Sequence, residues 1–238
     1  MKRLRIAHLY PRDMNIYGDV GNVITLRRRL EWRGYAVDVV PVEVGTPFRW
    51  EDADIVFGGG GQDSAQLRIA DDLSARADDL RRAAGEGLPM LVICGLYQLF
   101  GRWFTTFGGQ TILGIGIFNA TTRAARQRLI GNVVVDSRFG RLVGFETHSG
   151  QTTLEPGQAP LGTVRKGHGN NLRGGDEGAV TREVIGCYLH GPVLPKNPAL
   201  ADHLIAAALI RRYGSSELPA LDDSLERKAA ARAAARAA

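Results

Sequence analysis

Short apolar runs alternate with amphipathic segments through the N-terminal part of the chain. The apolar runs predict buried strands over residues 4–9, 36–42, 53–57 and 89–93. Between these runs, apolar residues recur at helical spacing, first at Val23, Leu26 and Leu30 and later at Leu67, Leu73 and Leu80. Strands that alternate with helices are typical of a mostly parallel, doubly wound sheet. We therefore expect an α/β fold with helices on both faces of the sheet.

The middle of the chain follows a different pattern. Short β-rich runs separated by turn residues predict antiparallel strands, or an extension of the sheet, over residues 111–118, 132–136, 141–147 and 161–165. A glycine- and asparagine-rich loop follows at residues 166–175. A last core strand is predicted over residues 183–189, and an amphipathic helix over 199–213 that ends at Gly214. One domain of residues 1–214 accounts for all these elements.

Residues 215–238 form a tail in which the composition shifts toward alanine and arginine. The tail has helix propensity but no apolar face that could be buried against the domain. We therefore expect it to be frayed or disordered and to lie outside the fold.

The net charge of +5 comes mainly from scattered arginines. No aromatic-basic or helix-turn-helix pattern accompanies them, so the charge indicates a solvated surface and not a nucleic-acid site. No run approaches the roughly 20 apolar residues of a membrane span, and the N-terminus lacks the apolar core of a signal peptide. We expect a cytoplasmic protein, whose two cysteines are one reactive thiol and one buried packing thiol at Cys187.

Cys94 follows a predicted buried strand, and a helix is predicted to begin directly after it. A sharp turn of this kind exposes a nucleophile, and the small Gly95 permits the turn. His190 follows the last predicted strand in a Gly-Pro loop, where it could act as general base and acid for the thiol. Alternatively, Cys94 is a packing residue and His190 caps a turn. Their shared place at strand ends favours the catalytic interpretation, because ligands bind at the carboxyl edge of such sheets.

Four glycines, residues 58–61, follow the third predicted strand. Backbone N–H groups of such a loop could cradle a phosphate, but the Gly-Lys-Ser/Thr of a Walker loop is missing. With Cys94 nearby, we favour an oxyanion hole formed by Gly59, Gly60 and Gly95. A flexible turn without function is the alternative. Asp19 and Asn22 stand where they could cap the first helix, and no histidine has the neighbours that a metal site needs.

These segments together resemble class I glutamine amidotransferases of the CobB/CobQ-like branch. The motifs that carry the resemblance are the glycine loop, Cys94-Gly95-Leu96-Tyr97-Gln98 and Tyr188-Leu189-His190-Gly191. Within the branch, the chain resembles the GatD-type glutaminase subunits of lipid II isoglutaminyl synthase. That similarity rests on residues 9–22, 144–152 and 167–171 and covers nearly everything up to Gly214.

The resemblance implies a flavodoxin-like fold and a glutaminase. Cys94 would form a glutamyl thioester, His190 would be its base and acid, and Arg128 would hold the α-carboxylate of L-glutamine, with Gln98, His148 and Ser149 in the same pocket. Ammonia would pass to a MurT-like Mur ligase in a heterodimer, and that ligase would use ATP and Mg to amidate D-glutamate of lipid II. The chain itself would need no cofactor and no metal.

The chain departs from this family pattern in three places. Leu96 and Ser149 stand where related sequences usually have glycine, and no carboxylate follows His190 in the sequence. The acid that orients His190 must then come from elsewhere in the chain or, as a hypothesis, from the partner. Alternative functions are a stand-alone Cys-His hydrolase with its own orienting acid, and a non-catalytic binding module.

Overall fold

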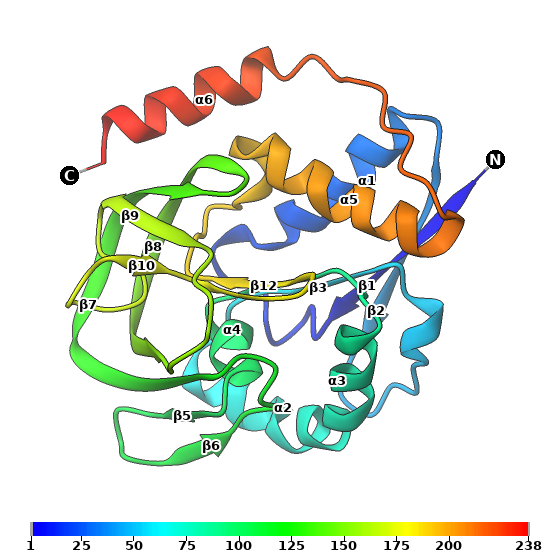
Figure 1. Ribbon diagram of the computed structural model, residues 1–238. Helices are drawn as coiled ribbons and strands as arrows, with labels where there is room; N and C mark the ends of the chain where they lie inside the picture. The colour runs from blue at the N-terminus through cyan, green and yellow to red at the C-terminus, as the bar shows by residue number, and fades with distance from the viewer. Residues whose placement is uncertain (1, 238) are drawn as a thin grey trace.

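The central β-sheet of the computed structural model, which describes residues 2–237, confirms the α/β expectation (Figure 1). Its strands run in the order β11-β12-β4-β3-β1-β2. Their bounds are β1 Arg3–Leu9, β2 Ala36–Val42, β3 Ile55–Gly58, β4 Met90–Ile93, β11 Ala179–Thr181 and β12 Val184–Cys187. All neighbours pair in parallel except β11, which is antiparallel to β12. The parallel strands are continuous apolar runs because helices cover both of their faces.

Helices α1 and α5 cover one face of this sheet, and α2, α3 and α4 cover the other (Figure 1). Their bounds are α1 Val20–Glu31, α2 Asp63–Ala75, α3 Ala77–Gly85, α4 Gly95–Phe100 and α5 Pro198–Tyr213, with short 3₁₀ turns η1 Ile16–Gly18, η2 Trp50–Asp52 and η3 Leu194–Lys196. Between residues 2 and 237, no helix combines the length and the apolar character that a bilayer crossing requires.

A second sheet contains the strands of the middle section, in the order β10-β9-β7-β5-β6 with β8 paired to β7. Its strands are β5 Trp103–Thr105, β6 Thr111–Leu113, β7 Ala120–Ser137, β8 Gly140–Leu154, β9 Gly162–Lys166 and β10 Asp176–Glu177. Strands β7 and β8 are much longer than the short runs predicted from the sequence, because Gly131 and Gly150 lie inside strands and do not end them.

The candidate residues lie at the carboxyl ends of the central strands. Strand β3 leads into the glycine loop, β4 into Cys94, and β12 into the segment that ends at His190. Strand β8 of the second sheet reaches the same edge, because its Phe145 exchanges two backbone hydrogen bonds with His190, at 2.8 and 3.1 Å. The two sheets therefore meet at the proposed site.

The C-terminal segment differs from the expectation of a frayed tail. Residues Ser224–Ala235 form helix α6, which lies against β7, β8 and η3 (Figure 1). Polar contacts take the place of the missing apolar face. Asp223, just before the helix, pairs with the buried Arg29 at 2.6 Å, and Lys166 Nζ donates to the carbonyl of Ala237 at 3.3 Å near its end. These contacts tie the start and the end of α6 to the rest of the domain.

Substitution of Asp202 by alanine is expected to lower the free energy of unfolding by about 3 kcal/mol. The Asp202 carboxylate in α5 pairs with Arg29 at 2.7 Å and with Arg33 at 2.8 Å, and both guanidinium groups are almost fully buried. Removing the carboxylate leaves these buried charges short of partners. Urea unfolding curves measure the loss. Asp38→Ala, which breaks the exposed pair with Arg3, is the control and should cost less than about 1 kcal/mol. Equal losses in the two variants would contradict this account of the α1–α5 contact.

Candidate active site

Cys94 occupies a strained turn between β4 and α4. Its φ of 48° and ψ of −102° lie outside the regions that residues with a side chain usually adopt. Two backbone hydrogen bonds hold it there: its N–H donates to Cys187 O at 2.8 Å, and its carbonyl accepts from Gln98 N–H at 2.9 Å. Such a strand-to-helix elbow is the geometry that presents a nucleophile to a ligand at the top of a sheet.

His190 lies opposite Cys94 across the glycine loop. A Cβ atom built on Gly60 would come within 2.9 Å of His190 Cε1 and 3.2 Å of Cys94 Cβ. Only glycine fits at a position that both side chains approach this closely. The ring of Tyr17 packs edge-on against His190, with centroids 5.1 Å apart, and covers it from solvent. The structure therefore brings Cys94 and His190 together, as the sequence predicted.

Asp19 supplies the carboxylate that the sequence analysis could not place. Its Oδ1 lies 3.2 Å from His190 Nδ1, and its Oδ2 accepts the Gly60 N–H at 2.7 Å. Asp19 is fully buried. Asp19 holds the N-cap position of α1, as the sequence indicates, but its side chain makes no hydrogen bond to the helix. The sequence feature that could have indicated this role is the position of Asp19 in the segment after β1, which leads to the same sheet edge as His190. The acid beside His190 thus comes from this chain, so the geometry needs none from a partner.

The charge state of His190 follows from these neighbours. Burial opposes a charge on the imidazole, but attraction to a Cys94 thiolate and the hydrogen bond to Asp19 outweigh burial and raise the pKa of His190 to about 10. The raised pKa favours the imidazolium form of His190, which lies between Cys94 and Asp19. An imidazolium of this kind stabilises a thiolate nucleophile and can protonate a leaving group.

A cavity of about 380 Å³ opens over Cys94 and is lined by the predicted binding residues Gln98, Arg128, His148 and Ser149. This volume is within the usual range of small-molecule sites. The cavity wall is predominantly polar, and Gly61 and Gln66 contribute from the loop after β3 and from α2. It suits a small polar substrate.

A break in the pairing of β7 and β8 places Arg128 and Ser149 at the cavity. Ala124 pairs with Gly150 and Leu129 pairs with His148, so residues 125–128 bulge out opposite the single residue Ser149. Arg128 Nη2 donates to the carbonyl and hydroxyl oxygens of Thr147, at 3.2 and 3.1 Å. These bonds fix the guanidinium at the rim while leaving donors free for a ligand.

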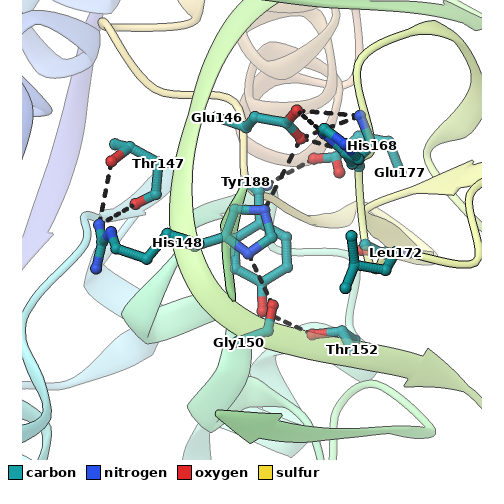
Figure 2. Close-up of polar contacts among 12 residues, drawn as sticks. Glu146, Thr147, His148, Gly150, Thr152, His168, Leu172, Glu177 and Tyr188 are labelled. Carbon is teal, nitrogen blue, oxygen red and sulfur yellow. Dashed lines mark hydrogen bonds and ion pairs between the residues drawn. The ribbon is translucent and has the colours of Figure 1, made fainter. Parts of the chain in front are cut away.

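Gln98 and His148 form the inner wall and are already engaged by neighbours. Gln98 Nε2 donates to the Tyr188 hydroxyl at 3.1 Å, and Gln98 Oε1 accepts from Gln66 Nε2 at 2.8 Å. The His148 ring is stacked on Tyr188 with centroids 3.6 Å apart (Figure 2). These contacts make the wall rigid, so Gln98 and His148 shape the cavity.

The structure does not leave the backbone of Gly59 and Gly60 free for the predicted oxyanion hole. The Gly60 N–H is taken by Asp19, and a Cβ on Gly59 would lie 2.4 Å from Met14 O, so Gly59 packs against the loop after β1. Gly61 instead lines the cavity, and a Cβ on Gly95 would lie 2.9 Å from Gly61 N. Gly61, which lines the cavity with Cys94, and Gly95, which follows Cys94 at the start of α4, are therefore the candidates for the oxyanion hole.

The remaining candidates lie outside the cavity. Leu96, which departs from the family pattern, is fully buried. Its side chain packs over Gly58: a Cβ atom built on Gly58 would come within 2.2 Å of Leu96 Cδ1. Cys187 is buried, and burial raises the pKa of its thiol well above the usual range, as expected of a packing residue. Within residues 2–237, no group of His, Cys, Asp and Glu side chains is arranged as a metal site.

The chain is similar in sequence to two glutamine-hydrolyzing subunits and in fold to a solved glutamine amidotransferase. Over 227 residues, the chain is 37% identical to the lipid II isoglutaminyl synthase (glutamine-hydrolyzing) subunit GatD of Staphylococcus aureus, covering 95% of this chain and 93% of that one. The GatD subunit of Streptococcus pneumoniae is 39% identical over 232 residues, covering 96% and 89%. A solved glutamine amidotransferase superposes with a TM-score of 0.57 at 14% identity, covering 85% of this chain and 98% of that one, which supports the fold.

Residues 5–198 match the CobB/CobQ-like glutamine amidotransferase domain, a span that begins in β1 and ends at the first residue of α5. It includes Asp19, the glycine loop, Cys94, Arg128 and His190. The chain therefore belongs to the CobB/CobQ-like glutamine amidotransferase family.

Proposed function

We propose that the chain is a glutaminase subunit that hydrolyses L-glutamine to glutamate and ammonia through a Cys94 thioester. One observation carries the proposal: Cys94 on its strained turn, His190 and Asp19 converge at the glycine loop beside a polar cavity. Two relatives that share nearly the whole length of this chain are named as glutamine-hydrolysing subunits, which supports glutamine as the substrate.

In the first half of the reaction, the Cys94 thiolate attacks the carbonyl carbon of the glutamine side-chain amide. The oxyanion that forms accepts hydrogen bonds from the N–H groups of Gly61, which lines the cavity with Cys94, and of Gly95, which follows Cys94 in the chain. As the C–N bond breaks, the His190 imidazolium gives its proton to the leaving nitrogen. Ammonia departs, and a glutamyl thioester remains on Cys94.

In the second half, the neutral His190 takes a proton from water, and the resulting hydroxide attacks the thioester carbon. The C–S bond breaks, glutamate leaves, and Cys94 returns as a thiolate next to the His190 imidazolium. Asp19 acts on His190 throughout. It accepts a hydrogen bond from the Nδ1–H group, fixes the tautomer and keeps Nε2 directed at the reacting atoms.

Substitution of Arg128 by lysine is expected to raise KM for glutamine by about 10- to 100-fold with a smaller effect on kcat. Arg128 is proposed to hold the substrate α-carboxylate with two parallel N–H donors, and an ammonium group offers no such planar pair. Steady-state glutaminase kinetics measure the change. Arg126→Lys, an exposed neighbour on the same strand, should leave KM unchanged. A loss confined to kcat would place Arg128 in the chemical step and not in binding.

The ammonia is proposed to serve a separate ATP-dependent Mur-type ligase that amidates D-glutamate of lipid II. The relatives named above are subunits of lipid II isoglutaminyl synthase, and this chain spans 93% and 89% of their lengths. ATP and Mg would then be bound by the ligase. The pair would form a heterodimer in the cytoplasm and act on a membrane-bound substrate without inserting into the membrane.

A stand-alone hydrolase is the second candidate, and Asp19 favours it, because such an enzyme needs its own orienting acid. Co-expression with a Mur-ligase-like protein from the same genome separates the two functions. A stable complex that converts glutamine, ATP and lipid II to amidated lipid II supports the subunit. Rapid glutamine hydrolysis without complex formation or amidated product supports the stand-alone enzyme.

A further inference from the structure

Tyr17 lines the catalytic cavity, but the proposed reaction gives it no part beyond covering His190. Its φ of 57° and ψ of 22° fall in the left-handed region, which bulky residues rarely adopt. Two backbone bonds hold this turn: Ile16 N–H donates to Gly60 O at 3.2 Å, and Asp19 N–H donates to Ile16 O at 3.3 Å. Strain that the surroundings maintain beside a ligand cavity points to a function for the strained residue.

The Tyr17 side chain contacts the two groups that act on opposite ends of the proposed substrate. Its ring packs edge-on against His190, which acts at the side-chain amide, with centroids 5.1 Å apart. Its hydroxyl oxygen lies 3.5 Å from Arg128 Nη2, which belongs to the proposed partner of the α-carboxylate. The hydroxyl is therefore at the carboxylate end of the cavity.

The hydroxyl proton of Tyr17 is available to a ligand. A guanidinium group has only donors, so in the contact with Arg128 the Tyr17 oxygen accepts, and among residues 2–237 no acceptor takes its proton. The distance of 3.5 Å is at the outer limit of a hydrogen bond, so this contact holds the hydroxyl only loosely. The residue is also 51% exposed, which leaves it room to turn toward a ligand.

The inner wall of the cavity offers a carboxylate little. The side-chain amide of Gln98 already donates to Tyr188, and the Nδ1–H of His148 donates to Gly150 O at 2.7 Å. Burial lowers the pKa of His148 to about 3, so its ring is neutral. A carboxylate bound to Arg128 is thus better served from the outer side, where a free O–H stands next to the guanidinium. Hydrogen bonds to an ionised carboxylate are stronger than those between neutral groups.

We propose that the Tyr17 hydroxyl donates a hydrogen bond to the α-carboxylate that Arg128 holds, and that Tyr17 thereby selects substrates with a free α-carboxylate. The inference rests on the proposed glutaminase function for the identity of the substrate. The α-carboxylate does not change during the reaction, so the contact is the same in the ground state and in the transition state. It therefore acts on KM and not on kcat.

Tyr17→Phe tests the contact, because it removes the hydroxyl and keeps the ring over His190. KM for L-glutamine should rise about tenfold and kcat should stay within about twofold, measured as ammonia release by the full chain. Tyr35→Phe is the matched control. It removes a tyrosine hydroxyl that bonds to Glu217 O at 3.0 Å, outside the cavity, and should leave KM unchanged. An unchanged KM in Tyr17→Phe overturns the proposal, as does a loss confined to kcat, which would mean that Tyr17 acts on His190.

A substrate analogue separates recognition of the carboxylate from general damage to the cavity. 4-Aminobutanamide is glutamine without its α-carboxylate, so it cannot use the Tyr17 hydroxyl in the proposed way. Its Ki as a competitive inhibitor should be the same for the unmodified chain and for Tyr17→Phe. Equal weakening of L-glutamine and of 4-aminobutanamide would overturn the proposal, because it would show a change in the shape of the cavity.

Binding without turnover separates this inference from the glutaminase proposal. In the Cys94→Ala background, isothermal titration calorimetry should show that Tyr17→Phe weakens L-glutamine binding about tenfold. A chain that binds glutamine through Tyr17 but releases no ammonia keeps the contact and loses the proposed reaction. A chain that releases ammonia with the same KM in Tyr17→Phe keeps the reaction and loses the contact. Failure of the chain to bind or hydrolyse glutamine would overturn both.

Discussion

Replacement of Cys94 by alanine is expected to lower glutamine hydrolysis by about 10⁴-fold or more, because no thioester can form without the sulfur. The change removes one atom from a buried turn whose backbone bonds to Cys187 and Gln98 remain. The fold should therefore persist, and the loss should appear in kcat. Release of glutamate from labelled glutamine, measured on the chain alone and in the complex with a ligase, gives the result.

The same variant tests the division of labour with the ligase. Added ammonium should restore amidation of lipid II by the complex that contains Cys94→Ala, since the ligase needs only the nitrogen. Cys187→Ala is the matched control: that thiol is buried, with packing as its role, so hydrolysis should change only a few-fold. If ammonium cannot rescue the Cys94 variant, the chain does more than supply ammonia. Unchanged hydrolysis would remove Cys94 from the mechanism altogether.

Cys94 and His190 could be located from the sequence because their positions depend on local patterns. Each follows a short apolar run, and the carboxyl ends of parallel strands meet at one edge of a sheet. The strand limits were predicted to within two residues for β1, β2, β3 and β4. Arg128 was reached only through resemblance, because a bulge opposite Ser149 has no signature in β7 itself.

Asp19 and α6 show what local patterns cannot give. Asp19 stands before a helix, where a cap is the ordinary role, and its true partners His190 and Gly60 are distant in sequence. Helix α6 lacks an apolar face, and the contact that holds its start is made by Asp223 with Arg29 in α1. Both features depend on contacts between residues that are far apart in the sequence and meet only when the sheets and helices have assembled. The pattern within one segment therefore does not predict them.

Asp19→Asn is expected to lower kcat/KM for glutamine by about 10²- to 10⁴-fold. Asp19 uses both carboxylate oxygens, one for His190 Nδ1 and one for the Gly60 N–H. An asparagine has a single acceptor, so either His190 loses its orientation or the glycine loop loses its bond. Asp13→Asn, in the same loop and paired with the exposed Arg68, is the control and should keep normal activity. If the ligase restores full activity to the Asp19 variant, the partner supplies an equivalent acid.

The pH profile separates an electrostatic role of Asp19 from a purely structural one. Burial lowers the pKa of His190, while Cys94 and Asp19 raise it to about 10, so the imidazolium persists up to that pH. Without the Asp19 charge the pKa must fall, and the imidazolium loses its proton at lower pH. The alkaline limb of kcat/KM should therefore move to lower pH in Asp19→Asn. A uniform loss of activity with an unmoved limb would mean that Asp19 only holds the loop, because a carboxylate that stabilises the imidazolium cannot be neutralised without moving that limb.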